Sequence, residues 1–540
     1  MKHLLSHINY LQVKQRIILF GILLFIVISI SVSGTNYYVS GTGKDSNNGL
    51  SKSSPFLTIQ KASNLTNPGD TVFVMNGTYK NIYSDVVTIS RSGSADKRIV
   101  YTAFPGHHPV LQFNGWQGFN VYGSAYIAIS GFEIIGNTAN MDSITAYSQR
   151  TNGNNPLTSG NGISVQPNGT KYPHHIFISN NIVHDCGGGG IGTGNADYVT
   201  IEDNVVYNTS WYSCYDNSGI SVGWCSNFDQ DTTNYKIIIR RNLCYNNKNE
   251  IPALQGGGIT DGEGIIVDIQ DGSAGNVPAY TGRMLIENNI CFRNGGDGIT
   301  LFKTNHVDVL NNTCYLNDQS RAINRGQIAP NQGKNTRIYN NILYSLAGKA
   351  INLNCCPNVN LSMDYNLYWS SNGSPSASLI KATGPHDRKA DPMFKMPSTN
   401  PVLADFHLQT GSPAIGSGTS LLAPNIDFEG NIRPSATGFD IGAYQYVNTT
   451  STTTLSDISS ISVYPNPAGL STTLSINSTK SETYCVILTN ILGETVFKQS
   501  FQAITGISKL YIPLQNMKQG FYFLSVTDKA NCHRIKLVKE

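Results

Sequence analysis

One short segment recurs through the middle of the chain, and this repeat limits the fold more than any other feature. Each copy is an alternating apolar strand that ends in asparagine, as in HIFISNN from His175, VTIEDN from Val199 and KIIIRRN from Lys236. The final asparagines fall at Asn181, Asn204, Asn242, Asn289, Asn312, Asn341 and Asn366, with steps of 23, 38, 47, 23, 29 and 25 residues. A base period with long insertions predicts stacked coils, because extra residues can only loop outward from a coil.

Two columns of similar residues follow these asparagines. One column holds Val183, Val206, Cys244, Cys291, Cys314 and Leu343, and the next holds His184, Tyr207, Tyr245, Phe292, Tyr315, Tyr344 and Trp369. Parallel coils stack equivalent residues about 4.8 Å apart, so we expect an apolar ladder, an aromatic ladder and an asparagine ladder that hydrogen-bonds from coil to coil. The cysteines share their column with valine and leucine, which favours packing over metal binding.

The composition supports an all-β fold and excludes two classes of protein. Charged residues make up only 13% of the chain, whereas it contains 28 Tyr and 20 Phe, so it is not a disordered chain. A net charge of +3 provides no basic surface, and we expect no nucleic-acid partner. Scarce charge and 52 Gly also disfavour a mainly helical protein.

The amino terminus, residues 1–33, predicts a secretory signal peptide. Lys2, Lys14 and Arg16 precede a predominantly apolar run, 17–30, and small residues follow it. The alternative is an uncleaved membrane anchor, because the run approaches the length of about 18 residues that spans a bilayer. Export permits disulfides among the ten cysteines, and Cys214 with Cys225 could close a local loop.

Residues 34–447 resemble a right-handed parallel β-helix of the pectate-lyase-like superfamily. The resemblance rests on the repeat, on the opening YYVSGTGKDSNNG from Tyr37, and on the closing segments DFHLQTGSPAIG from Asp405 and FDIGAYQY from Phe439. It implies an amino-terminal capping helix near 56–65. The fold hosts lyases, glycosidases, esterases and non-catalytic surface proteins, so the resemblance alone does not assign a reaction.

The carboxy-terminal residues form a separate module. A Thr/Ser linker, 448–460, precedes residues 461–540, whose alternating strands predict a small β-sandwich. YPNP from Tyr464, GETV from Gly493, GFYF from Gly520 and a basic last strand resemble the type A C-terminal sorting domain of the Bacteroidota type IX secretion system. The resemblance implies that the secretion machinery is a partner and that the protein is secreted or displayed on the cell surface. The alternative is a carbohydrate-binding sandwich.

Charged residues concentrate beside the two longest insertions. We expect the second strand of successive coils to begin at Ile265, Ile299, Ile323 and Ile351. This alignment puts Glu263, Asp297, Arg321 and Lys349 at one lateral position, with Asp268, Lys303, His306 and Arg325 on the outward face nearby. These charges either pair on a solvated surface or bind a metal ion and a sugar chain in a groove.

The favoured interpretation is a lyase that cleaves a uronate-containing polysaccharide by β-elimination. This reaction needs a base for the proton on C5 and cations that neutralise the uronate carboxylate. We assign Lys303 as the base and Arg321 or Arg325 as the carboxylate-binding group, with Ca²⁺ held by Asp261, Glu263, Asp268 and Asp271. The substrate-binding residues are then Trp211, Trp224, Phe302 and His306. A lysine base must be neutral, and nearby carboxylates work against that; the aspartate cluster typical of the better-known pectate lyases is also missing.

Two other interpretations stay open. Glu263 and Asp297 on adjacent coils would be spaced for a retaining glycoside hydrolase, whereas Asp268 with Asp297 would suit an inverting one. The protein could instead bind polysaccharide on the cell surface without cleaving it. We expect a monomer, and the sequence does not identify the polymer.

Overall fold

The computed structural model describes residues 34–539 except 82–83, 275–276, 353–355, 402, 434–437, 447–457, 467, 491–494, 518–519 and 528–531. The chain divides into two compact units, Met1–Gln445 and Tyr446–Glu540. The predicted signal peptide and residues 448–457 of the predicted linker lie outside the described residues. Within the described part of the chain, no helix is both long enough and apolar enough to cross a membrane.

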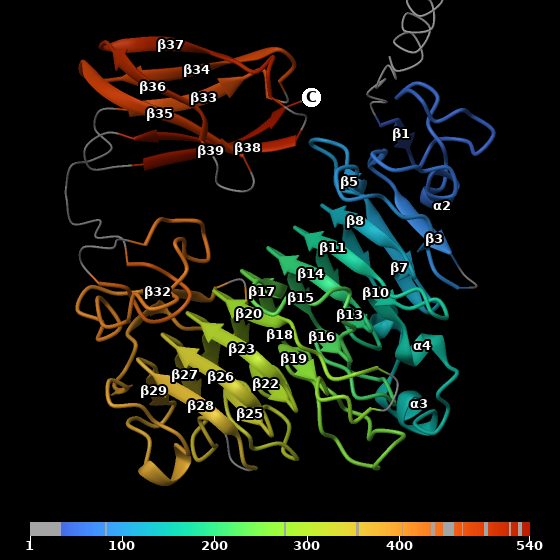
Figure 1. The fold of residues 1–540 in the computed structure, drawn as a ribbon, viewed down its shortest axis with the longest axis vertical. Coiled ribbons are helices and arrows are strands. Elements are labelled where there is room, and N and C mark those ends of the chain that lie inside the picture. The colour runs from blue at the N-terminus through green and yellow to red at the C-terminus, as the bar shows by residue number, and fades with distance from the viewer. Residues whose placement is uncertain are drawn as a thin grey trace, which may run out of the picture. The chain divides into compact units, whose positions relative to one another are not determined.

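The first unit is a parallel β-helix with three sheets (Figure 1). One eleven-stranded sheet contains β1 (Asn36–Val39), β2 (Thr71–Val74), β5 (Ile99–Ala103), β8 (Ala125–Ser130), β11 (His174–Ser179), β14 (Asp197–Glu202), β17 (Tyr235–Arg240), β20 (Arg283–Glu287), β23 (Asn305–Leu310), β26 (Lys334–Tyr339) and β28 (Val359–Asp364). The eight-stranded sheet contains β4 (Val87–Ile89), β7 (Gln117–Tyr122), β10 (Asn161–Gln166), β13 (Ile191–Gly194), β16 (Ile220–Gly223), β19 (Ile265–Asp268), β22 (Ile299–Phe302) and β25 (Ile328–Asn331).

The second eleven-stranded sheet completes each coil. It contains β3 (Thr78–Asn81), β6 (Val110–Phe113), β9 (Glu133–Ile135), β12 (Ile182–His184), β15 (Val205–Tyr207), β18 (Leu243–Tyr245), β21 (Ile290–Phe292), β24 (Thr313–Tyr315), β27 (Ile342–Ser345), β29 (Leu367–Ser370) and β30 (Arg388–Lys389). The short helical segments are α2 (Ile59–Ser63), η1 (Thr138–Asn140), α3 (Ser143–Ser148), α4 (Pro156–Ser159) and η2 (Ala377–Leu379). An antiparallel pair, β31 (Phe394–Met396) and β32 (Asp405–Leu408), follows the last coil.

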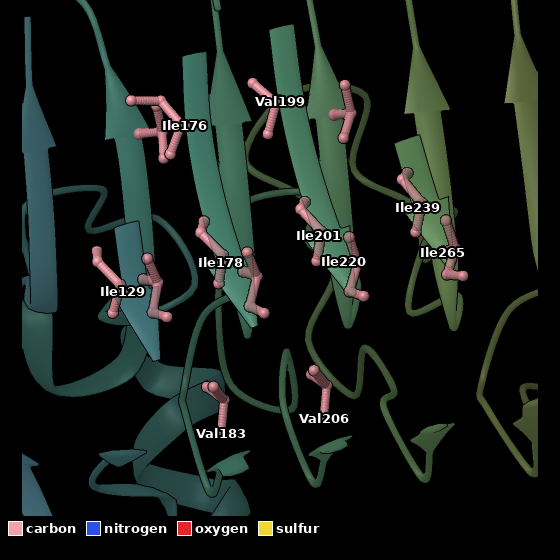
Figure 2. Close-up of a cluster of buried hydrophobic side chains, with 14 of the residues drawn as sticks. Ile129, Ile176, Ile178, Val183, Val199, Ile201, Val206, Ile220, Ile239 and Ile265 are labelled. Atoms are coloured by element: carbon pink, nitrogen blue, oxygen red, sulfur yellow. The ribbon is translucent and has the colours of Figure 1, made fainter. Parts of the chain in front are cut away.

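The core of the β-helix is built from rows of aliphatic side chains, one from each coil. Val199 of β14 pairs in register with Ile237 of β17, and both are buried. Figure 2 shows such rows, with Ile178 and Ile201 at equivalent positions of successive coils. Alternating side chains thus point inward from every strand, which explains why the sequence alternates apolar and polar residues.

The predicted ladders are confirmed. The columns pair in register, for example Cys244 with Cys291 and Tyr207 with Tyr245. The side-chain amide of Asn242 donates to Oδ1 of Asn289 at 3.0 Å, and the bonds are continuous from Asn181 to Asn366. The whole asparagine ladder is buried, so these bonds stabilise one coil against the next.

Replacing Asn289 by alanine should lower the free energy of unfolding by about 2–4 kcal/mol. The substitution removes the acceptor shared by the backbone N–H and the side-chain amide of Asn242, although the amide keeps the carbonyls of Ile201 and Arg240. A buried donor left without its acceptor costs about 1–3 kcal/mol, and each further lost hydrogen bond adds about 1 kcal/mol. Chemical denaturation measures the loss. Asn154→Ala, at an exposed position, is the control and should change the value by less than about 0.5 kcal/mol. Equal effects of the two substitutions would contradict a stabilising role for the ladder.

The cysteines act as packing residues. The eight whose side chains are described are all unpaired, including Cys214 and Cys225, so the disulfide considered between those two is absent. Cys244, Cys291 and Cys314 are fully buried in the predicted apolar column. Stability of this region therefore comes from side-chain packing and amide ladders rather than from covalent links.

The second unit consists of two antiparallel sheets. One contains β33 (Ile458–Tyr464), β34 (Ser471–Ser478) and β37 (Gly506–Pro513), and the other β35 (Glu482–Asn490), β36 (Thr495–Ala503), β38 (Gly520–Thr527) and β39 (Cys532–Lys539). Buried residues from both sheets, such as Leu474, Val486 and Leu524, form its own core. This arrangement is the predicted small β-sandwich.

Candidate functional site

The eight-stranded sheet corrects one part of the predicted alignment. Ile299 pairs with Ile328, not with Ile323, and Ile328 in turn bridges to Asn352 rather than to Ile351. The connection between β24 and β25 contains an additional turn. Ile323 lies in this connection, and its apolar side chain resembles the first residue of a strand in the sequence pattern. The prediction that Arg321 and Lys349 share the lateral position of Glu263 is therefore wrong.

These two cations lie elsewhere. Arg321 is exposed in the connection before β25. The ammonium of Lys349 donates to the backbone carbonyls of Ser320 at 3.1 Å and Ile323 at 2.5 Å. Neither cation contacts Glu263 or Asp297, so Arg321 does not lie where the sequence placed it as a candidate to bind the uronate carboxylate.

Arg325 connects the two carboxylates that the repeat predicts to be neighbours. Glu263 and Asp297 precede adjacent strands, β19 and β22, and both are fully buried. Nη2 of Arg325 lies 2.5 Å from Oε1 of Glu263, and its Nε lies 3.2 Å from Oδ2 of Asp297. Ser218 donates from Oγ to the other oxygen of Glu263 at 2.5 Å. The guanidinium thus places one positive charge between two buried carboxyl groups.

Asp318 is a member of this cluster that the sequence did not suggest. It is fully buried and accepts from the backbone N–H of Gly326 at 2.9 Å. Burial raises the pKa of Asp318 well above its usual range, and the adjacent carboxylate of Asp297 adds to the effect. If Asp297 and Asp318 were both ionised, the buried Oδ1 atom of each would have no hydrogen-bond donor. A protonated Asp318 could supply that donor, which agrees with its raised pKa.

Two partly buried carboxyl groups flank β19: Asp268 is its last residue, and Asp261 lies in the connection before it. Burial raises the pKa of Asp268 to about 7, and the carboxylates of Asp261 and Asp216 add to the effect. Burial also raises the pKa of Asp261 to about 6, although the hydroxyl of Thr260 opposes it. Carboxyl groups that titrate near neutral pH are suited to proton transfer, and such groups cluster at active sites.

Lys303 and Phe302 lie at the same end of the eight-stranded sheet as Asp268. Phe302 pairs with Asp268 on the adjacent strand. The ammonium of Lys303 lies 5.2 Å from the centre of the Phe302 ring. The ammonium also contacts Oγ of Ser273 at 3.2 Å. Its positive charge works against the raised pKa of Asp268. Lys303 is therefore a cation beside a carboxyl group, an arrangement that suits binding an anion better than acting as a base.

The predicted substrate-binding residues are only partly brought together. Trp224 is exposed, and its backbone N–H donates to the carbonyl of Asp268 at 3.2 Å. Trp211 lies in the connection before β16, where its indole N–H donates to the carbonyl of Asn246 at 2.9 Å. His306 is exposed on β23 of a different sheet, beside Asn335. Trp224 and Phe302 thus accompany Asp268, whereas Trp211 and His306 do not.

The four predicted calcium ligands, Asp261, Glu263, Asp268 and Asp271, do not fit a calcium site. Glu263 is directed into the Arg325 cluster, and Asp271 accepts from the backbone N–H of Ser273 in an exposed turn. No group of three or more His, Cys, Asp or Glu side chains suitable for a metal ion occurs among the described residues. Calcium needs six to eight oxygen ligands around one point, and this arrangement does not supply them.

Long connections precede and follow the strands of the eight-stranded sheet around these residues. The connections before β16, β19 and β25 are 208–219, 246–264 and 316–327, and those after β16 and β19 are 224–234 and 269–282. Neighbouring connections bond to one another, as Leu254 N–H does to the carbonyl of Cys214 at 2.7 Å. Both ends of β19 are therefore flanked by long connections.

Known proteins resemble both units. Residues 37–335 match the family described as Pel9A-like, right handed beta helix region, and residues 462–540 match the secretion system C-terminal sorting domain. The solved pectate lyase Pel9A shares 19% identity over 77% of this chain and 97% of its own, with a TM-score of 0.46. The structure of XylC with xylose shares 12% identity over 88% of this chain and 100% of its own, with a TM-score of 0.40. A rhamnogalacturonan lyase shares 15% identity over 66% of this chain and 87% of its own, with a TM-score of 0.34. No curated protein matches the chain.

Proposed function

Because the chain belongs to the Pel9A-like right-handed β-helix family and ends in a type IX sorting domain, we propose that it is an exported polysaccharide lyase acting on a uronate-containing polymer. The sorting domain directs the protein to the cell surface or the extracellular space. The observation that carries the proposal is the carboxyl pair Asp261 and Asp268, with the Lys303 cation beside Asp268.

The proposed reaction is a β-elimination carried out by these three groups. The carboxylate of Asp261, which has the lower pKa, removes the proton from C5 of the uronate. The electron pair of that bond forms the C4–C5 double bond, and the C4–O bond breaks. Asp268, which has the higher pKa, donates its proton to the leaving oxygen. The Lys303 ammonium pairs with the uronate carboxylate and stabilises the negative charge that develops next to it.

The pH dependence of turnover should be bell-shaped, with apparent pKa values near 6 and 7. Below about pH 6 Asp261 is protonated and cannot act as the base, and above about pH 7 Asp268 has lost the proton it must donate. Initial rates at constant ionic strength between pH 4 and 9 measure this profile. Because the carboxyl groups interact, the two values belong to the pair. A rate independent of pH across this range would contradict the assignment.

Product analysis tests the reaction itself. The purified mature protein is incubated with a panel of polysaccharides, with and without chelator. Elimination creates an unsaturated sugar that absorbs ultraviolet light, and we expect this absorbance together with new reducing ends. Reducing ends without absorbance would show hydrolysis, and binding without either product would show a non-catalytic protein.

Glycoside hydrolysis is the second candidate, and the same carboxyl pair favours it. Two carboxyl groups with different pKa values near neutrality can serve as the acid and the base of an inverting hydrolase. Asp268 would protonate the glycosidic oxygen and Asp261 would activate water. The pairs of Glu263 or Asp268 with Asp297 that the sequence suggests are less suitable, because Asp297 is buried against Arg325.

A further inference from the structure

A cavity of about 280 Å³ lies between two connections of the β-helix, apart from the carboxyl pair. Its lining consists of Tyr172, Pro173, His174, Ser226, Asn227 and Phe228. The first three residues come from the segment around the start of β11, and the last three from the connection between β16 and β17. None of these residues takes part in the proposed reaction.

Aromatic rings dominate the cavity and are unusually exposed. Phe228 is 48% exposed and Tyr172 is 41% exposed. The ring of His174 lies 3.9 Å from that of Phe228, centre to centre, at an angle of 30°. Exposed aromatic groups gathered on one surface are characteristic of binding sites.

The connection that carries Phe228 is held firmly in place. The backbone N–H of Phe228 donates to Oδ2 of Asp197 at 2.8 Å, and the same carboxylate forms a fully buried ion pair with Lys236 at 2.6 Å. Asn227 donates to the carbonyl of Ala279 and accepts from the backbone N–H of Thr281, both at 2.9 Å. The ring is thus positioned before any ligand arrives, which reduces the entropy lost on binding.

We propose that this cavity binds one sugar residue of a polysaccharide, with its C–H face stacked on Phe228. The lining contains no acid, lysine or arginine, so it suits the apolar face of a sugar ring rather than a carboxylate. His174 is uncharged at neutral pH, because burial and the neighbouring His175 lower its pKa to about 4. The choice of a polysaccharide as the ligand rests on the proposed function. Binding of the sugar in this cavity does not require that the polysaccharide is cleaved.

The cavity and the reaction groups are linked by one short stretch of chain. Trp224 begins the connection that carries Phe228, and its backbone N–H is bonded to Asp268. A sugar held on Phe228 is therefore anchored to the same connection that borders the carboxyl pair. Such a site holds the polymer while another of its residues is cleaved, which increases the effective concentration of the scissile bond.

Affinity electrophoresis of the full chain tests this site. The protein is run through gels that contain polygalacturonate, alginate or xylan, and the dissociation constant is obtained from the retardation. Phe228→Ala should weaken binding to the retained polymer about fivefold to tenfold, whereas Phe228→Tyr, which keeps the ring, should bind like the wild type. Tyr147→Ala, another exposed aromatic position, is the matched control and should have no effect.

Each outcome either supports or overturns the site. Equal retardation of Phe228→Ala and the wild type would overturn it, as would the absence of retardation of the wild type by all three polymers. A concentration-dependent change of mass that is lost in Phe228→Ala, without retardation by any polymer, would instead assign the surface to contact between copies. Asp268→Asn separates the two proposals, because it should abolish turnover while leaving retardation unchanged.

Discussion

Replacing Arg325 by alanine should lower the free energy of unfolding at pH 7 by about 3–5 kcal/mol. The substitution leaves the buried carboxyl groups of Glu263 and Asp297 without the guanidinium that contacts both, and removing one partner of a buried ion pair carries a penalty of this size. Urea denaturation followed by circular dichroism measures the loss. Arg321→Ala removes an exposed arginine four positions away, which is not part of the cluster, and should cost less than about 0.5 kcal/mol.

The deficit of Arg325→Ala should shrink as the pH falls from 7 to 5. Burial already raises the pKa of Glu263 well above its usual range, and removal of the guanidinium raises it further. A carboxyl group whose pKa is higher in the folded state than in the unfolded state destabilises the fold as pH rises above the unfolded value of about 4.3. Acid therefore relieves the penalty. A deficit that is constant between these pH values would show that the loss comes from packing rather than from charge.

Replacing Asp268 by asparagine should lower kcat about 10²- to 10⁴-fold while KM changes little. The amide keeps the shape of the side chain but cannot donate the proton that the leaving oxygen needs, and general acid catalysis contributes about this much to an enzymatic rate. The loss should be greatest at and below the optimum of the wild type and should shrink on the alkaline side, where wild-type Asp268 has itself lost its proton. Initial rates of product formation measure the effect.

The matched control for this substitution is Asp96→Asn, at an exposed carboxylate in an earlier coil. It should leave kcat, KM and the melting temperature unchanged. Asp268→Asn should also keep the melting temperature of the wild type or raise it slightly, because a partly buried carboxyl with a raised pKa is no asset to stability at neutral pH. Full activity of Asp268→Asn would remove this residue from the reaction and leave the family assignment intact.

The regular part of the β-helix could be predicted from the sequence because each coil repeats the same physical requirement. Asn242 and Asn289 are separated by 47 residues, yet both were aligned correctly, since the amide, apolar and aromatic columns fix the register together. A second buried ladder, in which Asn247 donates to Asn294 and Asn294 to Asn317, escaped prediction. Its members lie past the strands, where no alternating pattern marks their positions.

In the candidate site, only the residues that belong to the repeating coils could be predicted from the sequence. Glu263 and Asp297 were correctly expected as neighbours because both precede strands of the eight-stranded sheet. Arg325 and Asp318 belong to an irregular connection, so neither the contacts of Arg325 with those carboxyl groups nor the raised pKa of Asp318 could be derived from spacing. The same connection misled the alignment at Ile323, where an apolar residue is buried without starting a strand.

The unequal coil lengths show that the stacked strands hardly constrain the length of the connections between them. The coil from Asn242 to Asn289 is about twice as long as the coil from Asn289 to Asn312, yet both ends join the ladder with the same amide bond at 3.0 Å. Doubling a flexible loop costs only about 0.6 kcal/mol in closure entropy. A lineage could therefore lengthen, shorten or exchange the connections that bear Asp261, Trp224 and Phe228 at almost no thermodynamic cost. Substrate preference can then diverge rapidly while the stacked framework stays the same.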